Sequence, residues 1–435
     1  MPFCRTKCSF CNFASGVFSR ALFDRYVDNV CADIAGAHAI ARELGGVLDA
    51  GVDSIYLGGG TPSVLAPDQL ERIFQAVHNA FEVERAAEIT VECAPGTISD
   101  EILDVLLRGG GNRVSLGVQS FVDKECASVG RLHTRASTLA DIARLRAAGI
   151  GNISIDLIAG LPHQTEESWR FSLVETLATG VPHVSVYMLE VDEDSRLGNE
   201  LLAGGSRYHA HFAPNDDLTA DLYLAACERL EQGGVEQYEI SNFARPVTHG
   251  IGLRHSRHNL KYWTRQPYVG FGVDAHSMLR AAPGIDADAV RFATSDSLEA
   301  YVQQRSAVSS QLSVGDPATS IQNSRIAQLK ASRMFVDRQA ALEESFFLGL
   351  RLNRGVSLDD LRARFGDAAI DDCSPVIAEL VGAGLLESVQ SPSYSKTVHE
   401  RDTRLRLTPR GRLLSNEVFA GFLRAPYAAP EGAQN

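Results

Sequence analysis

The chain has 435 residues, 45% of them hydrophobic, and a formal net charge of -13. This is enough for one large globular domain and one or two small ones. A nucleic-acid partner is excluded, because an acidic chain without a basic stripe cannot neutralise phosphates. No apolar run reaches the roughly 18 residues of a membrane span and no secretory leader is visible, so we expect a cytoplasmic protein. Eight cysteines are too sparse here for a disulfide scaffold, which fits a reducing compartment.

The first predicted element is a metal-binding loop. Cys4, Cys8 and Cys11 form a C-x3-C-x2-C run, and three thiolates this close together can ligate one metal centre. In an iron–sulfur cubane each iron takes one thiolate, so three cysteines leave the fourth iron open to another ligand. Zinc is the alternative, but it needs four ligands, and no second C-x2-C or histidine pair follows at a usable spacing. We therefore predict a [4Fe-4S] cluster on these three cysteines.

Alternating helices and strands follow this loop. Only three residues precede Cys4, so we expect the first strand to be missing, or the start of the chain to be assigned too late. A helix is predicted over 19–44, and a strand over 52–57 opens a repeating β/α pattern. Such a pattern gives right-handed parallel units, which predicts an α/β fold with a partial (β/α)6 TIM-like barrel. Further strands are predicted over 88–92, 113–120, 152–162 and 183–189.

Polar residues stand at the carboxyl ends of these strands, where ligands bind in parallel α/β architectures. The strand over 52–57 ends in the glycine-rich turn GGGTP, whose backbone can approach a ligand closely. A tight βα turn is the alternative. The carboxylates of Glu92 and Asp156 would be costly to bury without a function, although each could form a structural ion pair with Arg113 or Arg131. The residues predicted to line the ligand site are Gly59, Gly60, Thr61, Glu92, Gln119, Arg131 and Asp156.

The alternation loosens after residue 190. We expect a helix over 216–232, a strand-like YEISNFA stretch (238–244) and an irregular connector over 280–335. Three helices, two strands and a last helix then predict a C-terminal winged-helix-like module. The Ala/Pro-rich end of the chain is predicted to be disordered. The predicted divisions are a barrel over 1–190, a barrel extension over 191–341, a C-terminal module over 342–426 and a tail over 427–435.

The cysteine run, with Phe10 before its last cysteine, resembles the signature of the radical S-adenosylmethionine (SAM) superfamily. In that superfamily SAM chelates the open iron, and an electron from the cluster cleaves it to a 5′-deoxyadenosyl radical. The stretches TVE, RVSLGVQSF, GRLH and SIDLIAGLP resemble its HemN-type, coproporphyrinogen dehydrogenase branch. This resemblance implies that the glycine turn holds the SAM amino group. It also implies that the methionyl part, ribose and adenine of SAM contact Glu92, Gln119, Arg131 and Asp156.

One position separates two functions within this branch. The dehydrogenases carry a fourth cysteine two residues after the third, and this chain has Phe13 there. It therefore resembles the HemW subgroup of heme chaperones, which retain the cluster and SAM site but lack the dehydrogenase activity. YEISNFARP, the H-N-x-x-Y-W motif in RHNLKYW and the C-terminal LRLTPRGRLLSNEVFAGFL agree with this subgroup. Three residues depart from its usual pattern, with His163 and Asp274 in place of glycine and Ala94 in place of asparagine.

The H-N-x-x-Y-W stretch supplies the candidate heme ligands. His258 could bind heme iron because neutral imidazole is a common axial donor, and Tyr262 and Trp263 offer flat faces for a porphyrin. A loop histidine beside two core aromatic residues is the alternative. Further candidates are His249, His255 and His276 for the iron, and Arg254 and Arg257 for the propionates.

The resemblance implies a heme chaperone that carries a [4Fe-4S] cluster and SAM, binds heme and transfers it to an acceptor protein. The expected partners are heme, acceptor proteins that include membrane-bound ones met peripherally, an electron donor for the cluster and a second copy of the chain. One alternative is oxygen-independent coproporphyrinogen III oxidation, in which the radical abstracts a propionate hydrogen and decarboxylation follows. Another is a non-catalytic interaction protein with a vestigial cluster site, which a missing first strand favours.

Overall fold

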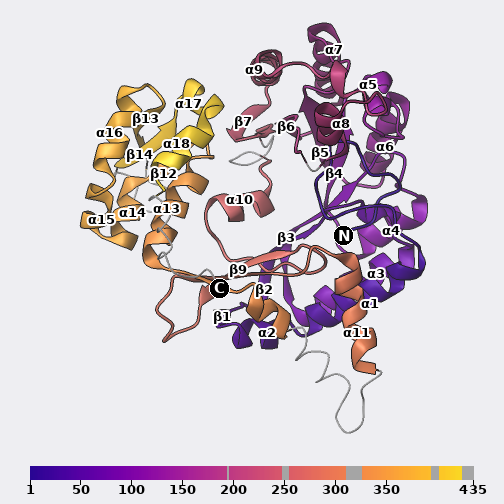
Figure 1. The fold of residues 1–435 in the computed structure, drawn as a ribbon, viewed down its shortest axis with the longest axis horizontal. Coiled ribbons are helices and arrows are strands. Elements are labelled where there is room, and N and C mark those ends of the chain that lie inside the picture. The colour runs from indigo at the N-terminus through magenta and orange to yellow at the C-terminus, as the bar shows by residue number, and fades with distance from the viewer. Residues whose placement is uncertain (194, 247–253, 310–325, 393–400, 424–435) are drawn as a thin grey trace.

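The computed structural model describes residues 1–193, 195–246, 254–309, 326–392 and 401–423. Its main body is a curled seven-stranded sheet in the order β2-β3-β4-β5-β6-β8-β7, with helices along its outer side (Figure 1). The strands from β2 to β6 run parallel, and helices connect them. The predicted α/β partial barrel is therefore confirmed. The parallel strands are β2 (Gly51–Leu57), β3 (Glu82–Cys93), β4 (Arg113–Gln119), β5 (Asn152–Ala159) and β6 (His183–Met188).

The connecting helices pack on the sheet because their apolar residues share one side. In α4 (Asp100–Arg108) the buried residues are aliphatic, and the hydroxyl of Ser99 accepts a hydrogen bond from the Ile102 N–H. Such a cap satisfies a backbone donor that the helix itself leaves free. Among the described residues, no helix is long and apolar enough to cross a membrane. The other helices on this side are α3 (Pro67–Ala80), α5 (Asp123–Ser128), α6 (Arg135–Ala147), α7 (Glu166–Thr179) and α9 (Asp216–Gln232).

The helix predicted over 19–44 is two helices. α1 (Ala21–Ala35) stops at Gly36, and α2 (Ala37–Glu43) follows directly. Glycine disfavours a helix interior by roughly 1 kcal/mol relative to alanine, which explains the break. The YEISNFA stretch likewise forms two strands, β7 (Glu236–Glu239) and β8 (Asn242–Ala244), which pair antiparallel and close the curled sheet next to β6.

The prediction of an irregular connector over 280–335 is wrong for the part that the structure describes. Strands of an antiparallel sheet in the order β1-β9-β10-β11 lie within it. The strands are short, and although β9 and β10 are neighbours in sequence, β1 and β11 pair with strands that are distant, so no periodicity in one window reveals the sheet. Helix α11 (Leu298–Ser309) follows β10. The strands are β1 (Gly46–Val47), β9 (His276–Ala281), β10 (Ala289–Ala293) and β11 (Met334–Val336).

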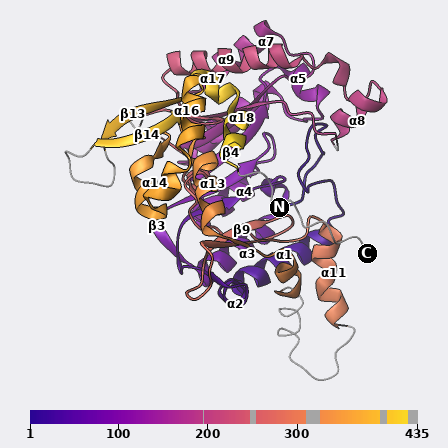
Figure 2. The same ribbon diagram turned by 60° about the vertical axis from the view of Figure 1, so that its left-hand side comes forward.

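The C-terminal module has its own hydrophobic core and lies beside the barrel (Figure 1, Figure 2). Its antiparallel sheet has the order β12-β14-β13, which adds a short strand to the two that were predicted. The last predicted helix is divided into α17 and α18. The predicted tail over 427–435 lies outside the described residues. The strands are β12 (Val356–Ser357), β13 (Leu386–Pro392) and β14 (Arg401–Leu407). The helices are α13 (Arg338–Gly349), α14 (Leu358–Phe365), α15 (Asp367–Asp371), α16 (Ser374–Gly382), α17 (Pro409–Leu413) and α18 (Ser415–Gly421).

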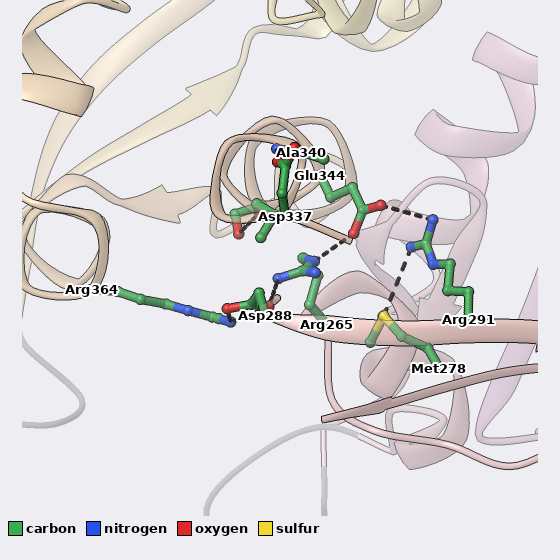
Figure 3. Close-up of polar contacts among 10 residues, drawn as sticks. Arg265, Met278, Asp288, Arg291, Asp337, Ala340, Glu344 and Arg364 are labelled. Atoms are coloured by element: carbon green, nitrogen blue, oxygen red, sulfur yellow. Dashed lines mark hydrogen bonds and ion pairs between the residues drawn. The ribbon is translucent and has the colours of Figure 1, made fainter. Parts of the chain in front are cut away.

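A buried network of ion pairs joins this module to the rest of the chain (Figure 3). The side chain of Arg265 is 2% exposed and donates from Nε to Glu344 at 2.8 Å and from Nη1 to Asp288 at 3.0 Å. Arg291 reaches the second oxygen of Glu344 at 2.7 Å, and Arg364 reaches Asp288 at 2.9 Å. Because Glu344 lies on α13 and Asp288 lies next to β10, the network fixes the module against the second sheet.

Candidate cofactor site

The three cysteines lie on a loop that is held from two sides. The Cys4 N–H donates to the Gly16 carbonyl at 2.9 Å, which closes the loop on itself. Ser9 donates from its N–H to the Val129 carbonyl at 3.1 Å and accepts at its carbonyl from the Leu197 N–H at 2.8 Å. Leu197 belongs to α8 (Arg196–Ala203), so the loop is fixed between the end of α5 and α8.

The three thiols fit a cubane better than a single metal ion. All are free, with Cys8 buried and the other two half-buried. Burial raises the pKa of Cys8, and Cys11 and Cys4 add to this, while Arg131 acts in the opposite direction. Within the described ranges, no group of three or more His, Cys, Asp or Glu residues could hold one metal ion. In a cubane each thiolate binds its own iron, so the sulfurs need not converge on a point.

The glycine-rich turn after β2 lies directly against the start of the chain. The Gly60 N–H donates to the Met1 carbonyl at 2.5 Å, and a Cβ on Gly60 would come within 2.7 Å of the Phe3 carbonyl. Gly59 has a φ of 100° and donates its N–H to Glu92 at 3.0 Å. Both amide hydrogens are therefore engaged inside the protein. The carbonyl oxygens are the groups of this turn that can accept from the amine of a ligand.

Glu92 is a half-buried carboxylate at the end of β3. Its Oε1 accepts from the Tyr56 hydroxyl at 2.7 Å, and its Oε2 accepts from the Gly59 N–H. Burial raises its pKa, and the neighbouring charge of Asp156 adds to this. Among the described residues, no lysine or arginine lies within ion-pair distance of Glu92. The ion-pair alternative is therefore not what the geometry shows here.

Asp156 was predicted at a strand end, but it lies inside β5 and is half-buried there. The Ser115 hydroxyl lies 3.1 and 3.2 Å from its two oxygens, and burial raises its pKa although Arg113 and Arg131 lie near enough to oppose the effect. In the part of the chain that is described, neither arginine forms an ion pair with it. Buried carboxylates without a cation are costly, so a positively charged or hydroxyl-bearing ligand would stabilise both Glu92 and Asp156.

Gln119 and Arg131 meet at the end of β4. A Cβ on Gly117 would lie 2.8 Å from Nη2 of Arg131 and 3.0 Å from Nε2 of Gln119, so a larger residue there would displace the ends of these two side chains. Arg131 has a buried Nε without a hydrogen-bond partner. Gln119 has a φ of 67°, in the left-handed region that non-glycine residues seldom adopt. Such strain is common at ligand sites. Thr61, the last residue of the predicted set, lies with its hydroxyl 3.7 Å from the Cys4 sulfur.

Two of the three departures from the family pattern fall on left-handed backbone. His163 has a φ of 68° and Asp274 a φ of 52°, where glycine would carry no steric penalty. The ring of His163 stacks on Phe212 and lies with Nε2 3.2 Å from Nδ1 of His209. Ala94 lines a smaller cavity of about 220 Å³ beside Arg131.

The H-N-x-x-Y-W stretch is the short helix α10 (Arg257–Trp263). The His258 ring stacks on Tyr56 with centroids 4.7 Å apart, and its Nε2 lies 2.9 Å from the Tyr262 hydroxyl. Burial lowers the pKa of His258 to about 4, so its imidazole is neutral near neutral pH. Its Nδ1 is buried and has no hydrogen-bond partner. Of the two ring nitrogens, Nδ1 is therefore the one without a hydrogen bond.

Trp263 faces the C-terminal module. The guanidinium of Arg351 lies 4.5 Å from the centre of its ring, a cation–π contact that covers one face. The indole Nε1 is buried without a partner. Tyr262 meets Tyr268 edge to face at 4.6 Å. The aromatic residues of the motif thus belong partly to the contacts that hold α10 in place.

The other heme candidates are less suited. His255 stacks on Tyr238 at 3.9 Å, and His276 is exposed and lies 3.5 Å from Asp274. Arg257 donates to the Ala86 carbonyl at 2.6 Å, so part of its guanidinium is engaged. Arg254 is exposed, and His249 lies outside the described residues.

A cavity of about 710 Å³ lies against β2 and the start of α10. Its lining includes Gly58 and Gly59 of the glycine turn, Tyr56, and His258 and Tyr262 of the H-N-x-x-Y-W stretch. The volume is in the range of pockets that hold drug-sized or cofactor-sized molecules. Of the residues predicted for SAM, Gly59 lines this cavity, whereas Thr61 and Arg131 line the smaller one. The larger cavity therefore joins the glycine turn to the segment predicted for heme.

Two residues that shape this site were missed in the sequence. Tyr56 binds Glu92 and stacks on His258, and Ser115 binds Asp156. The signal was present, because side chains two apart on a strand share a face. Tyr56 lies on β2, two residues before Gly58. Ser115 lies on β4, which pairs with β5, the strand that carries Asp156.

The comparisons with known proteins agree with this geometry. The Radical SAM superfamily profile matches residues 1–173, and the HemN C-terminal domain profile matches residues 336–388. The heme chaperone HemW of Synechocystis sp. is 32% identical, over 98% of this chain and 95% of its own. The heme chaperone HemW of Lactococcus lactis is 30% identical, over 97% of this chain and 96% of its own.

The solved structure of coproporphyrinogen III oxidase (HemN) from Escherichia coli has the same fold. It matches with a TM-score of 0.72 at 23% identity, over 97% of this chain and 88% of that one. The same family is indicated by the cysteine run, the partial barrel, the C-terminal module and the relatives that match over nearly the full length. The chain belongs to the radical SAM superfamily, in the HemW-type subgroup of its HemN-like branch.

Proposed function

We propose that this protein binds heme and passes it to an acceptor protein while carrying a [4Fe-4S] cluster and SAM. Relatives named heme chaperone HemW support this over nearly the whole chain. The observation that carries the proposal is the single cavity that joins the glycine turn beside Glu92 to His258 and Tyr262. A protein that coupled a SAM site to a heme site would need such a shared space.

Membership of the radical SAM superfamily implies the cluster and SAM. The cluster would be held by Cys4, Cys8 and Cys11, and when bound it supplies single electrons. SAM has an ammonium and two ribose hydroxyls, which would donate hydrogen bonds to the half-buried carboxylates of Glu92 and Asp156, and a sulfonium whose positive charge these carboxylates would stabilise. Its carboxylate would suit the guanidinium of Arg131. Gly59, Gly60, Thr61 and Gln119 would complete this site.

Heme would bind at the other end of the cavity. A neutral imidazole with a free nitrogen is a suitable axial donor, and His258 has both properties. Tyr56 and Tyr262 flank this ring and offer apolar surface to a porphyrin. Because one face of Trp263 is covered by Arg351, its part would be to hold α10 rather than to stack openly on heme.

Phe13 disfavours the oxidase alternative. It stands where the dehydrogenases have a fourth cysteine, and it is 62% exposed beside the cluster loop. We place the protein in the cytoplasm, with a heme acceptor and an electron donor for the cluster as its partners. The exposed Phe13 and Val17 of the cysteine loop would be available to such a donor.

The test is a heme titration of anaerobically reconstituted protein, followed by its Soret band. We expect binding near one heme per chain in the wild type and a shifted or lost band in His258→Ala. His78→Ala is the matched control, because this ring lies on the outer helix α3 and contacts the Gly109 carbonyl. An unchanged spectrum in His258→Ala would move the ligand to His255, His276, His249 or a cysteine. Absence of heme binding in the wild type would contradict the proposed function.

A further inference from the structure

We propose that a buried chain of hydrogen bonds links Asp156 to the first turn of α10, so that a ligand at Asp156 changes how firmly α10 is held. Ser154, His183 and Tyr238 are the positioning residues of this chain. The inference rests on the proposed function in one respect, because it takes Asp156 as a SAM contact and α10 as the heme segment. The hydrogen-bond chain itself is a property of the described residues.

The chain has four links. The Ser256 N–H lies 3.1 Å from the Tyr238 hydroxyl, and that hydroxyl lies 2.9 Å from Nε2 of His183. Nδ1 of His183 lies 2.8 Å from the Ser154 hydroxyl, which lies 3.4 Å from Oδ1 of Asp156. The side chains along this route are buried, with Ser154 and Ser256 at 0% exposure. Water therefore cannot replace a broken link at little cost.

The direction of every link is fixed by its two ends. A backbone N–H can only donate, so the Tyr238 hydroxyl accepts a hydrogen bond from Ser256. The same hydroxyl donates its own hydrogen bond to Nε2 of His183. His183 is neutral, because burial, with Arg113 adding to it, holds its pKa well below the usual range. Its one N–H is then on Nδ1 and donates to Ser154, whose hydroxyl donates to Asp156. A change in the hydrogen bonding of Asp156 therefore changes the strength or the direction of the hydrogen bonds along the whole chain.

Asp156 is the end that a ligand would perturb. Its carboxylate already accepts from Ser115, and the Ser154 contact is the longest link. A ligand that donates a hydrogen bond to this carboxylate occupies an oxygen lone pair, and this weakens the hydrogen bond from Ser154. A ligand that brings positive charge polarises the carboxylate and strengthens the same chain. Either outcome alters the hold on Ser256.

The two ends of α10 differ in how firmly they are held. Its residues are half-buried or exposed, and ring contacts as well as hydrogen bonds hold it. At its first turn the Ser256 N–H bonds to Tyr238, the His258 N–H bonds to Glu88 at 3.2 Å, and Arg257 donates to the Ala86 carbonyl. Beyond its last turn, Arg265 is paired with the buried Glu344 and the half-buried Asp288 (Figure 3). A change transmitted through Tyr238 would therefore move the end that carries His258 while the other end stays fixed.

Amide hydrogen exchange of the segment 254–263 tests this directly, measured on reconstituted protein with and without SAM. Exchange reports the local opening that the Ser256 bond opposes. We expect SAM to change the exchange rate of the Ser256 amide by about fivefold or more, the lower range of site-to-site coupling. Ser154→Ala should abolish this SAM-dependent change, although Ser154 touches neither α10 nor Tyr238. A purely structural role for Tyr238 would leave the response of Ser154→Ala intact.

Tyr238→Phe is the second variant, and it should also remove the response while retaining the ring that stacks on His255. Tyr223→Phe is the matched control, because its buried hydroxyl accepts from Gln237 and lies outside the chain. If SAM binds and the Ser256 exchange rate does not change, the hydrogen-bond chain carries no coupling. That result contradicts this inference and leaves the proposed function standing. If SAM does not bind the wild type, the SAM assignment of the proposed function falls, and this inference with it. A response that survives in Ser154→Ala also overturns it.

Discussion

Carboxylates in two regions of the molecule are paired in opposite ways. Where the C-terminal module meets the second sheet, the buried Glu344 and the half-buried Asp288 have arginine partners, and Glu344 bonds to both Arg265 and Arg291. At the mouth of the barrel, on β3 and β5, Glu92 and Asp156 are half-buried and form no ion pair among the described residues. The two regions differ in whether the protein supplies an arginine as the opposite charge.

The pKa values express the same difference. Burial acts to raise the pKa of Asp288, but hydrogen bonds from Arg364 and Arg265 hold it below its usual range. Burial raises the pKa of Glu92 and of Asp156, and no comparable partner offsets it. A paired carboxylate stabilises the fold in its ionised form, whereas an unpaired one weakens it. The two carboxylates at the mouth thus contribute less to fold stability in their ionised form than Asp288 does.

The largest effect is expected at the cysteine loop. Replacing Cys4, Cys8 and Cys11 with alanine should abolish the broad iron–sulfur absorption of reconstituted protein, because no other thiolates are bunched in this way. The triple variant Cys31→Ala/Cys227→Ala/Cys373→Ala is the control, since these thiols are scattered and half-buried. It should keep its iron. About four irons per chain in the first triple variant would contradict the cluster assignment.

The paired region should respond next most strongly. Glu344→Ala leaves Arg291 and part of Arg265 buried without a counter-charge, which typically costs about 3–5 kcal/mol in the free energy of unfolding. Chemical denaturation measures this. Glu343→Ala, on the same helix, removes a side chain whose partner is Gln339 and should cost less than about 1 kcal/mol. Equal effects of the two substitutions would contradict the claim that the network holds the module.

A pH effect is expected at Glu239, on β7. Burial raises its pKa to about 7, although Asn242 and Arg351 act to lower it. Between the ordinary carboxyl pKa and about 7, the folded protein keeps a proton that the unfolded chain has lost. Stability should therefore fall as pH rises through this window. The contribution is at most about 3 kcal/mol, since one pKa unit corresponds to about 1.4 kcal/mol.

The Glu239→Gln variant isolates this contribution. The difference in unfolding free energy between variant and wild type should grow in favour of the variant from pH 5 to pH 8. Glu343→Gln, measured in parallel, is the control for exchanging a glutamate for glutamine at a less buried position. A constant difference between Glu239→Gln and wild type at both pH values would show that Glu239 does not titrate in this window.

The smallest stability effect is expected at the mouth. Asp156→Asn keeps an acceptor for Ser115 and removes a charge that has no ion-pair partner in the described part of the chain. The ligand-free protein should change by less than about 1 kcal/mol in unfolding free energy, or become more stable. SAM affinity, measured by equilibrium binding, should fall at least about tenfold, which corresponds to one lost charged hydrogen bond. A loss of several kcal/mol in stability would instead make Asp156 a structural residue.

The predictions from the sequence succeeded where a pattern is local. Parallel strands carry apolar runs and end in glycine or a polar residue, so β2 to β6 and the position of Glu92 at a strand end were readable. Asp156 lies inside β5 instead, because the strand continues past it to Ala159. The C-terminal helices followed from helical spacing in the same way. The break at Gly36 was readable in principle, but a single glycine inside a helical pattern is often tolerated.

What failed depends on contacts between distant segments. β1 pairs with β9 across more than 200 residues of chain, as Val47 opposite Arg280 shows, so no window of sequence contains the signal. The absence of an ion pair at Glu92 could not be foreseen either. The sequence offers Arg113 and Arg131 as partners, but in the described part of the chain neither arginine forms an ion pair with Glu92. The same holds for Trp263, whose face is covered by Arg351 from the C-terminal module.

The claim that the protein handles heme rather than making its precursor is tested most directly by two parallel titrations. Anaerobically reconstituted protein with SAM and a reductant would be titrated with heme and, separately, with coproporphyrinogen III. Phe13 in place of a fourth cysteine, and His258 at the end of the shared cavity, predict heme binding near one per chain without conversion of coproporphyrinogen III. Formation of protoporphyrinogen IX would contradict the chaperone function and establish the oxidase in its place.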